Sequence, residues 1–285
     1  EPFEIQTSHL KIAGLKNSID TGVPVIALHG WLDNAASFSF LSEYLELERP
    51  FFAIDLPGHG LSEHRSNASS YHLLENIVDV IALLDELSFY GVNSKKATIV
   101  GHSLGGIIAS LLAAASPERV KDLILLDSMG PLTDETSEVL PQLRKATLKA
   151  SQIRSNVTVF PSLALATKAR MAGIGRLTKS AAECLVHRGT KEVAGGFTWS
   201  SDPKLLKPSF LRLSEVQVEA LFAGIECPVK LITGEHGYFS SDQALKKRLG
   251  YFNSIEQVSV EGGHHFHMDG DVKKTAELMN AYLSN

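Results

Sequence analysis

The 285-residue sequence predicts an α/β fold with a mostly parallel central sheet flanked by helices. Short apolar runs, bounded by Gly or Pro and typical of buried strands, alternate with stretches of helical periodicity. An earlier stretch, Phe3–Lys11, alternates weakly and is expected to form edge strands. The apolar runs predicted as buried strands are Val23–His29, Phe51–Asp55, Ala97–Gly101, Leu123–Asp127, Val229–Thr233 and Ile255–Val260.

Three helices are predicted between and after these runs. In Tyr71–Phe89 the apolar residues recur at spacings of three and four, and Gly91 follows where a C-terminal cap is expected. Leu104–Ala115 is small and apolar on all sides, which is typical of a helix buried between layers. Val272–Leu283 adds a further amphipathic pattern. Strands that alternate with helices in this way indicate a doubly wound sheet.

One long stretch has no clear strand pattern. Residues 131–210 are helix-prone, carry scattered Lys and Arg, and contain Gly-rich breaks at Gly173–Gly175 and Gly195–Gly196. A structureless loop of this length would be unusual inside a compact domain. We therefore expect a core formed by residues 1–130 and 211–285, with a helical cap domain formed by residues 131–210 inserted before the late strands.

The composition is that of an ordinary globular protein, with 44% hydrophobic and 21% charged residues. The net charge is −5 and no basic block occurs, so nucleic-acid binding is not expected. The longest apolar stretch, Ile107–Ala115, is far shorter than the roughly 20 residues that cross a bilayer, so no membrane association is expected. Cys184 and Cys227 imply no disulfide framework, which favours a cytoplasmic location.

The first motif that indicates catalysis is Gly101-His102-Ser103-Leu104-Gly105, which reads G-x-S-x-G. The motif follows an apolar run and precedes a small-residue helix, which is the strand–turn–helix context of a nucleophile elbow. Glycine is needed on both sides because the sharp turn leaves no room for side chains and strains the serine backbone. Ser103 is therefore the candidate nucleophile, and the N-terminus of the following helix favours developing negative charge.

An oxyanion hole needs preorganised hydrogen-bond donors, here two backbone N–H groups. One is expected from Leu104, directly after the candidate nucleophile, and the other from the loop after an early strand. His29-Gly30-Trp31 stands at the end of the predicted strand Val23–His29. The amide of Trp31 is therefore the candidate second donor.

The candidate base lies in the stretch GGHHFH (262–267), between the last predicted strand and the last helix. A histidine on a flexible turn at this point fits the chain order nucleophile, acid, base. His264 directly follows the glycines and is the candidate, with His265 and His267 as alternatives. The cluster could also suggest a metal site, but no carboxylate or cysteine set completes it, so no metal is expected. His102 is expected to pack within the elbow.

Together these motifs resemble the α/β-hydrolase superfamily over nearly the whole chain. They are HGWLDNA (29–35), DLPGHG (55–60), the elbow and Gly263-His264. HGWLDNA, with EHGYF (235–239), is most similar to the serine hydrolase-like proteins. The core also resembles haloalkane dehalogenases and coelenterazine luciferases, which use an Asp nucleophile. Because that position is Ser103 here, dehalogenation is not expected.

The triad acid departs from the common family pattern. Most members carry it after the strand that matches Val229–Thr233, where this sequence has Gly237, which cannot orient a histidine. Dehalogenase-like relatives place the acid after the strand that matches Leu123–Asp127. Asp127 is therefore the candidate acid, because a carboxylate at the far ring nitrogen of His264 meets the chemical need. Glu235 and Asp242 are the alternatives.

These residues predict a serine hydrolase, specifically a carboxylesterase that cleaves small to medium acyl esters through an acyl-enzyme on Ser103. The expected partner is a small-molecule ester, and neither an organic cofactor nor a metal is needed. Residues 131–210 resemble the cap of the superfamily, which covers the elbow and shapes an apolar pocket. Phe197, Trp199 and Phe210 are candidate lining residues.

Other functions remain open at this stage. The same triad acts on amides, thioesters or carbon–carbon bonds, or forms peracids, in other proteins of this fold. A ligand-binding member without catalysis would fit the missing carboxylate at Gly237, although the intact elbow and His264 argue against it. A cofactor-free oxygenase is a third alternative. The oligomeric state is not indicated.

Overall fold

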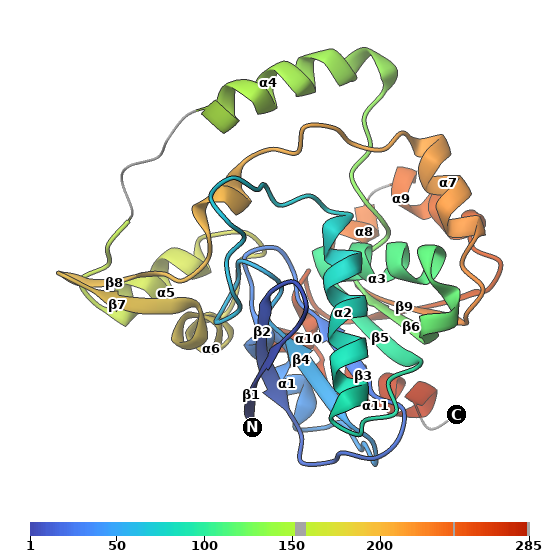
Figure 1. Cartoon of the computed structure of the whole chain (residues 1–285). Coiled ribbons are helices and arrows are strands. Elements are labelled where there is room, and N and C mark those ends of the chain that lie inside the picture. The colour runs from blue at the N-terminus through green and yellow to red at the C-terminus, as the bar shows by residue number, and fades with distance from the viewer. Residues whose placement is uncertain (152–157, 242, 284–285) are drawn as a thin grey trace.

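The computed structural model describes residues 1–151, 158–241 and 243–283 (Figure 1). Eight strands form one sheet in the order β1-β2-β4-β3-β5-β6-β9-β10. All neighbouring strands run parallel except β2, which is antiparallel to β1 and β4. The predicted mostly parallel sheet is thus confirmed, and β1 lies at its edge, within the stretch expected to form edge strands. The strands are β1 (Pro2–Gln6), β2 (Lys11–Lys16), β3 (Val25–Leu28), β4 (Phe51–Ile54), β5 (Ala97–His102), β6 (Val120–Leu126), β9 (Val229–Gly234) and β10 (Ile255–Val260).

The central strands read as continuous apolar runs because both faces of the sheet are covered. In β3, Val25 and Ala27 belong to one buried cluster, and Ile26 and Leu28 belong to the cluster on the opposite face. This is the two-residue alternation of a strand. A strand buried on both sides needs apolar residues at every position, which is why the pattern could be found in the sequence.

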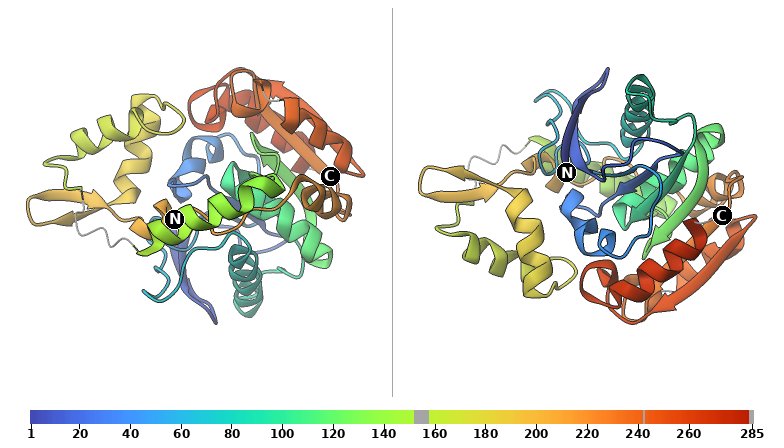
Figure 2. Two further views of the ribbon diagram at one scale, coloured as in Figure 1. Left: turned by 90° about the horizontal axis from the view of Figure 1, so that it is seen from above. Right: turned by 90° about the horizontal axis from the view of Figure 1, so that it is seen from below.

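Helices cover both faces of the sheet (Figures 1 and 2). Buried residues of α2, α3 and α7 pack in one cluster, and those of α1 and α11 in the other. The helices are α1 (Ser39–Ser42), α2 (Glu75–Phe89), α3 (Leu104–Ala115), α7 (Glu215–Ala223), α8 (Tyr238–Ser241), α9 (Gln243–Lys247), α10 (Phe266–Asp269) and α11 (Val272–Leu283). Among the described residues, none of the helices is long and apolar enough to cross a membrane.

One predicted helix begins later than its pattern suggests. The sequence predicts a start at Tyr71, whereas α2 starts at Glu75. The hydroxyl of Tyr71 donates to Asp202 at 2.9 Å and accepts the amide of Arg65 at 2.9 Å. These bonds hold Tyr71 in the loop before the helix. The predicted bounds of Leu104–Ala115 and Val272–Leu283 agree with α3 and α11.

The described part of residues 131–210 contains three α-helices and, in addition, a two-stranded hairpin that the sequence does not predict. The helices are α4 (Val139–Ser151), α5 (Leu163–Met171) and α6 (Lys179–Gly189), and the hairpin strands are β7 (Thr190–Val193) and β8 (Gly196–Trp199). Gly195 and Gly196 have φ values of 89° and 140°, so the predicted break is the hairpin turn. Neither hairpin strand forms a buried apolar run, which is why the sequence does not reveal them.

Two arginines of residues 131–210 pair with aspartates at the carboxyl edge of the sheet. Arg188 of α6 binds the buried carboxylate of Asp55 through Nε, 3.0 Å from both oxygens, and through Nη2 at 2.7 Å. Arg170 of α5 donates through Nη2 to Oδ1 of Asp33 at 2.5 Å. Figure 1 shows α5, α6 and the hairpin gathered on one side of the molecule. Paired buried charges of this kind hold two elements in a defined arrangement, because removal of either partner leaves an unpaired charge.

Candidate active site

The G-x-S-x-G motif forms the sharp turn that it predicts. β5 ends at His102, α3 begins at Leu104, and Ser103 between them has φ 49° and ψ −115°. This backbone conformation is strained for a residue with a side chain. A Cβ on Gly105 would collide with the backbone carbonyl of Leu28, so the turn accepts only glycine there. The strand and the helix thus hold Ser103 at the carboxyl edge of the sheet.

Asp127 follows β6 and lies directly against His264, which follows β10. Nδ1 of His264 is 2.6 Å from Oδ2 of Asp127, and both side chains are buried. The amide of Tyr238 donates to the same oxygen at 3.0 Å, and the amide of Gly234 donates to Oδ1 at 3.4 Å. Three donors therefore fix the carboxylate. In turn, the carboxylate holds the imidazole in the tautomer with its proton on Nδ1.

The place of the common family acid is occupied by Gly237, in contact with Asp127. A Cβ at position 237 would collide with both carboxylate oxygens of Asp127. Glycine after β9 and aspartate after β6 are therefore two parts of one packing arrangement. Glu235, an alternative acid, is exposed and forms no hydrogen bond with His264 among the described residues. Asp242, the other alternative, lies outside the described residues.

The loop that carries His264 packs against the elbow. Nε2 of His102 lies 2.9 Å from the carbonyl oxygen of His264, and the two ring centroids are 4.7 Å apart. The ring of Tyr238 also stacks on His264, with centroids 4.1 Å apart. In the described part of the chain, Ser103 Oγ makes no hydrogen bond with His264, as is common in unliganded sites. The structure thus joins Asp127 to His264 and places Ser103 on the adjoining turn.

The two candidate oxyanion donors follow neighbouring strands, β3 and β5. Within the described residues, the backbone N–H groups of Trp31 and Leu104 donate to no protein acceptor. The indole Nε1 of Trp31 donates to the carbonyl of Leu205 at 3.1 Å, which ties this loop to the residue 131–210 segment. Two backbone donors without a protein acceptor in the described part of the chain, at the ends of the neighbouring strands β3 and β5, fit an oxyanion hole.

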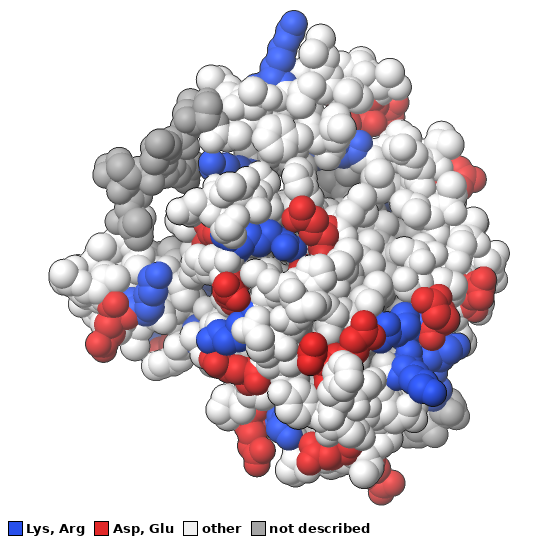
Figure 3. Space-filling model, viewed as in Figure 1, with Lys and Arg blue, Asp and Glu red and all other residues white. Residues whose placement is uncertain are grey.

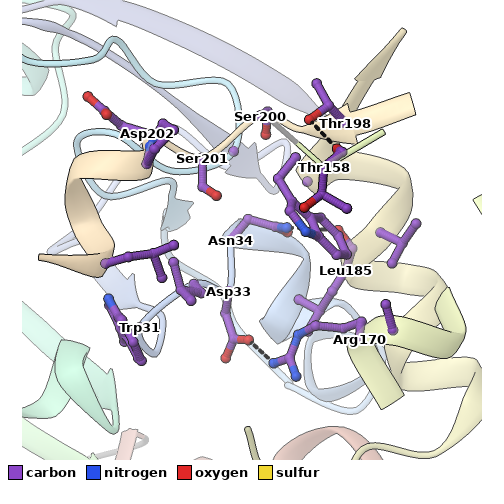
Figure 4. Close-up of a pocket in the computed structure, with 18 of the residues that line it drawn as sticks. Trp31, Asp33, Asn34, Thr158, Arg170, Leu185, Thr198, Ser200, Ser201 and Asp202 are labelled. Atoms are coloured by element: carbon purple, nitrogen blue, oxygen red, sulfur yellow. Dashed lines mark hydrogen bonds and ion pairs between the residues drawn. The ribbon is translucent and has the colours of Figure 1, made fainter. Parts of the chain in front are cut away.

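A cavity of about 280 Å³ lies beside Trp31 (Figure 4). Its wall combines the loop that follows β3 with residues of α5, α6 and β8, and includes Leu185 and Trp199. The predicted lining role is correct for Trp199 and wrong for Phe197 and Phe210. The backbone of Phe197 pairs with Phe160, and the ring of Phe210 stacks on His72. The volume is near the lower end for ligand sites, and neither Ser103 nor His264 is among the lining residues.

The alternative bases lie behind the candidate triad. Nε2 of His265 is 3.1 Å from Oδ2 of Asp33, and Nε2 of His267 is 2.9 Å from the hydroxyl of Ser37. Burial alone would raise the pKa of Asp33, but His265 and then Arg170 outweigh it and hold that pKa well below its usual value. The sequence does not single out Asp33 or Arg170. Asp33 stands in the HGWLDNA motif and could have been suspected, whereas nothing in α5 marks Arg170.

Figure 3 shows Lys and Arg interspersed with Asp and Glu over one face of the molecule. This mixed distribution differs from the clustered basic face that nucleic-acid binding proteins present. The features that mark the candidate site are therefore its small cavity and its polar cluster, and not an electrostatic potential of one sign.

The fold, the nucleophile elbow and the carboxylate paired with a histidine are features of α/β hydrolases. The comparison with known families agrees with this assignment. Residues 23–271 match the family model described as "alpha/beta hydrolase fold". This chain therefore belongs to the α/β-hydrolase family.

Within the family, the chain is close to the serine hydrolase-like proteins. It is 31% identical to "Serine hydrolase-like protein 2" of Homo sapiens over 284 residues, which cover 92% of this chain and 87% of that protein. It is 29% identical to "Esterase Rv0045c" of Mycobacterium tuberculosis over 242 residues, covering 84% of this chain and 76% of that protein. The crystal structure of the hypothetical protein PA1622 from Pseudomonas aeruginosa PAO1 matches with a TM-score of 0.94 at 35% identity, over 100% of both chains. These relatives support hydrolase activity.

Proposed function

We propose that this protein is a carboxylesterase that cleaves small to medium acyl esters through an acyl-enzyme on Ser103. The observation that carries the proposal is the 2.6 Å contact between Asp127 and His264 beside the strained turn at Ser103. A nucleophile, a base and an orienting carboxylate, which follow β5, β10 and β6 at the carboxyl edge of the sheet, are the parts that acyl transfer needs. The relative named as an esterase supports an ester as the bond that is cleaved.

In the first step, Nε2 of His264 removes the proton of the Ser103 hydroxyl as its oxygen attacks the ester carbonyl. The amides of Trp31 and Leu104 then receive the oxyanion of the tetrahedral intermediate. Each such donor contributes roughly 3 kcal/mol of transition-state stabilisation in comparable enzymes. Because both amides are free of protein acceptors, they need no rearrangement before the reaction.

Asp127 acts through His264. Its carboxylate stabilises the imidazolium that forms when His264 takes the proton, and holds Nε2 toward the reacting atoms. The imidazolium then protonates the leaving alcohol, which breaks the ester bond and leaves the acyl group on Ser103. A water molecule, activated by His264, attacks this acyl-enzyme and releases the acid.

We also propose that residues 131–210 form a cap over this site. The buried pairs Arg170–Asp33 and Arg188–Asp55 anchor α5 and α6 beside the loop that carries Trp31. The cavity enclosed there is large enough for a short acyl or alcohol group.

A cytoplasmic location is part of the proposal, because Cys184 and Cys227 are both free thiols. Burial raises the pKa of both thiols, to about 11 for Cys227, so they are unreactive at neutral pH.

The experiment is turnover of p-nitrophenyl esters of graded acyl length. Ser103→Ala should lower kcat by roughly 10⁶-fold, by comparison with nucleophile removal in other serine hydrolases. Ser110→Ala is the matched control, since this buried serine of α3 bonds only to its own helix at Gly106. Activity that survives in Ser103→Ala, or absence of release from the unmodified protein with every ester, would contradict the proposal.

A further inference from the structure

A second polar cluster lies behind the candidate triad and has no part in the mechanism above. It consists of Asp33, His102 and His265, which are 3%, 0% and 3% exposed. One ligand atom from each residue lies within 4.8 Å of the other two. The sequence hides this cluster because the carboxylate is 232 positions away from His265.

The tautomer of His102 is set by its surroundings. Its Nε2 lies 2.9 Å from the carbonyl oxygen of His264, and a carbonyl can only accept, so Nε2 carries the proton. Nδ1 is then a bare lone pair, and it is buried without a hydrogen-bond partner.

This lone pair faces a second acceptor. Oδ2 of Asp33 lies 3.8 Å from Nδ1 of His102, and Nε2 of His265 lies 3.1 Å from the same oxygen. Two buried acceptors that face each other repel unless a cation or a hydrogen-bond donor lies between them. Ligand atoms that share one zinc ion at about 2.0 to 2.2 Å lie roughly 3 to 4 Å apart. The two separations from Oδ2 of Asp33 fall in that range, and the ligand nitrogens of His102 and His265 lie within 4.8 Å of each other.

We propose that Asp33, His102 and His265 bind a divalent transition-metal ion, for which Zn²⁺ is the best fit. Two imidazoles and one carboxylate suit Zn²⁺ and disfavour Mg²⁺ or Ca²⁺, which prefer oxygen ligands alone. In the bound state His265 carries its proton on Nδ1, which frees Nε2 for the ion.

The surroundings of the three ligands suit this assignment. The bond from His102 to the carbonyl of His264 is the kind of outer contact that orients metal-binding histidines. Arg170 occupies Oδ1 of Asp33 and leaves Oδ2 for the ion, although its positive charge weakens the affinity. A Cβ on Gly30 would lie 2.9 Å from Nδ1 of His102 and 3.0 Å from Oδ2 of Asp33, so glycine avoids crowding both ligands. Asp33 and Arg170 also line the cavity of Figure 4, which provides a route for the ion.

Each ligand is next to a residue of the proposed catalytic machinery. His102 precedes Ser103, His265 follows His264, and Asp33 lies two residues after Trp31. An ion that draws the three ligands together therefore displaces the elbow, the base and the oxyanion loop. We expect reversible inhibition, a consequence that rests on the proposed function, whereas the binding itself does not.

The test is calorimetric titration of the purified protein with zinc chloride. One Zn²⁺ ion per chain should bind to the unmodified protein, and Asp33→Asn and His265→Gln should each weaken binding at least tenfold. His267→Gln is the matched control, because His267 stacks on His102 with centroids 4.2 Å apart but bonds to Ser37. Circular dichroism tests whether each variant is folded. If Asp33→Asn is unfolded, the binding measured with His265→Gln decides whether the metal site exists.

Two outcomes would overturn the proposal. One is the absence of binding, which would mean that a proton or a water molecule bridges the two acceptors. The other is equal binding by all four proteins, which would mean adventitious contact with exposed histidines only. In a second arm, Zn²⁺ should slow ester turnover, and EDTA should restore it. Because calorimetry needs no turnover, failure of the esterase proposal is distinguishable from failure of the metal site.

Discussion

Two adjacent histidines, His264 and His265, each pair with an aspartate, and the hydrogen-bond partners around the two pairs differ. Asp127 is held by two backbone amides and leaves Nε2 of His264 without a hydrogen-bond partner among the described residues. Asp33 is held by Arg170 and engages Nε2 of His265 instead. The same two side chains therefore leave Nε2 of the histidine available in one place, as the proposed general base requires, and form a buried charge cluster in the other.

The comparison shows that the ring nitrogen bonded to the carboxylate decides what the pair can do. A carboxylate on Nδ1 leaves Nε2 for proton transfer, as the triad mechanism requires. A carboxylate on Nε2 leaves Nδ1, which in His265 is buried without a partner. Neighbouring positions in one loop thus have separate roles, and substitutions at the two aspartates should separate them.

The largest expected effect is on catalysis at the first pair. Asp127→Asn should lower kcat by about 10⁴-fold, because the amide no longer stabilises the imidazolium and favours the wrong tautomer of His264. Steady-state turnover of a p-nitrophenyl ester measures this. Glu235→Gln is the control, since that side chain is exposed and should leave kcat unchanged. A larger loss in Glu235→Gln than in Asp127→Asn would assign the acid to Glu235.

The second pair should respond in stability more than in turnover. Asp33→Asn leaves the guanidinium of Arg170 buried without its carboxylate and should lower the free energy of unfolding by about 3 kcal/mol. Urea denaturation measures this change. Asp20→Asn removes an exposed pair with Lys16 and should change stability by less than about 1 kcal/mol. The two pairs would not have separate roles if Asp33→Asn kept its full stability and lowered kcat as severely as Asp127→Asn does.

A third variant tests the packing between the two strand ends. Gly237→Ala should lower kcat by about 10²-fold, because the methyl group displaces the carboxylate of Asp127 from His264. In an Asp127→Gly background the same substitution should add little, since the collision is gone. Gly250→Ala is the control, because no heavy atom lies within 4 Å of its Cβ position. Additive effects in the double variant would contradict the packing argument.

The smallest effect concerns the residue that stacks on His264. Tyr238→Phe should change kcat by less than about twofold, because the backbone amide of Tyr238, and not its hydroxyl, donates to Asp127. The ring contact is retained in this variant. A loss of more than tenfold in the same turnover assay would show that the phenol takes part in the reaction.

How far the sequence predicts the structure depends on how local the determining contacts are. The central strands are readable because both faces are buried, and the elbow is readable because its glycines are set by sterics within five residues. The hairpin β7–β8 is not, since its strands are mostly exposed or half-buried and form no buried apolar run. A strand end alone marks Asp127 as a candidate, but its orientation depends on amides from the loop that follows β9.

The cluster around Asp33 shows the limit most clearly. The histidine-rich stretch at 264–267 indicates no metal when only its neighbours in the sequence are considered. The fold brings Asp33 and His102 to it from two other strand ends. Likewise, Arg170 reaches Asp33 from a segment whose docking no local pattern predicts.

The most direct test of the central claim is the site and rate of covalent labelling by a fluorophosphonate, mapped by peptide mass spectrometry. The account predicts one adduct, on Ser103, that forms far more slowly in Asp127→Asn and at nearly the normal rate in folded Asp33→Asn. An adduct on Ser128, whose hydroxyl donates to the Ser103 carbonyl at 2.7 Å, would contradict it, as would labelling of Ser103 at a rate that Asp127→Asn leaves unchanged.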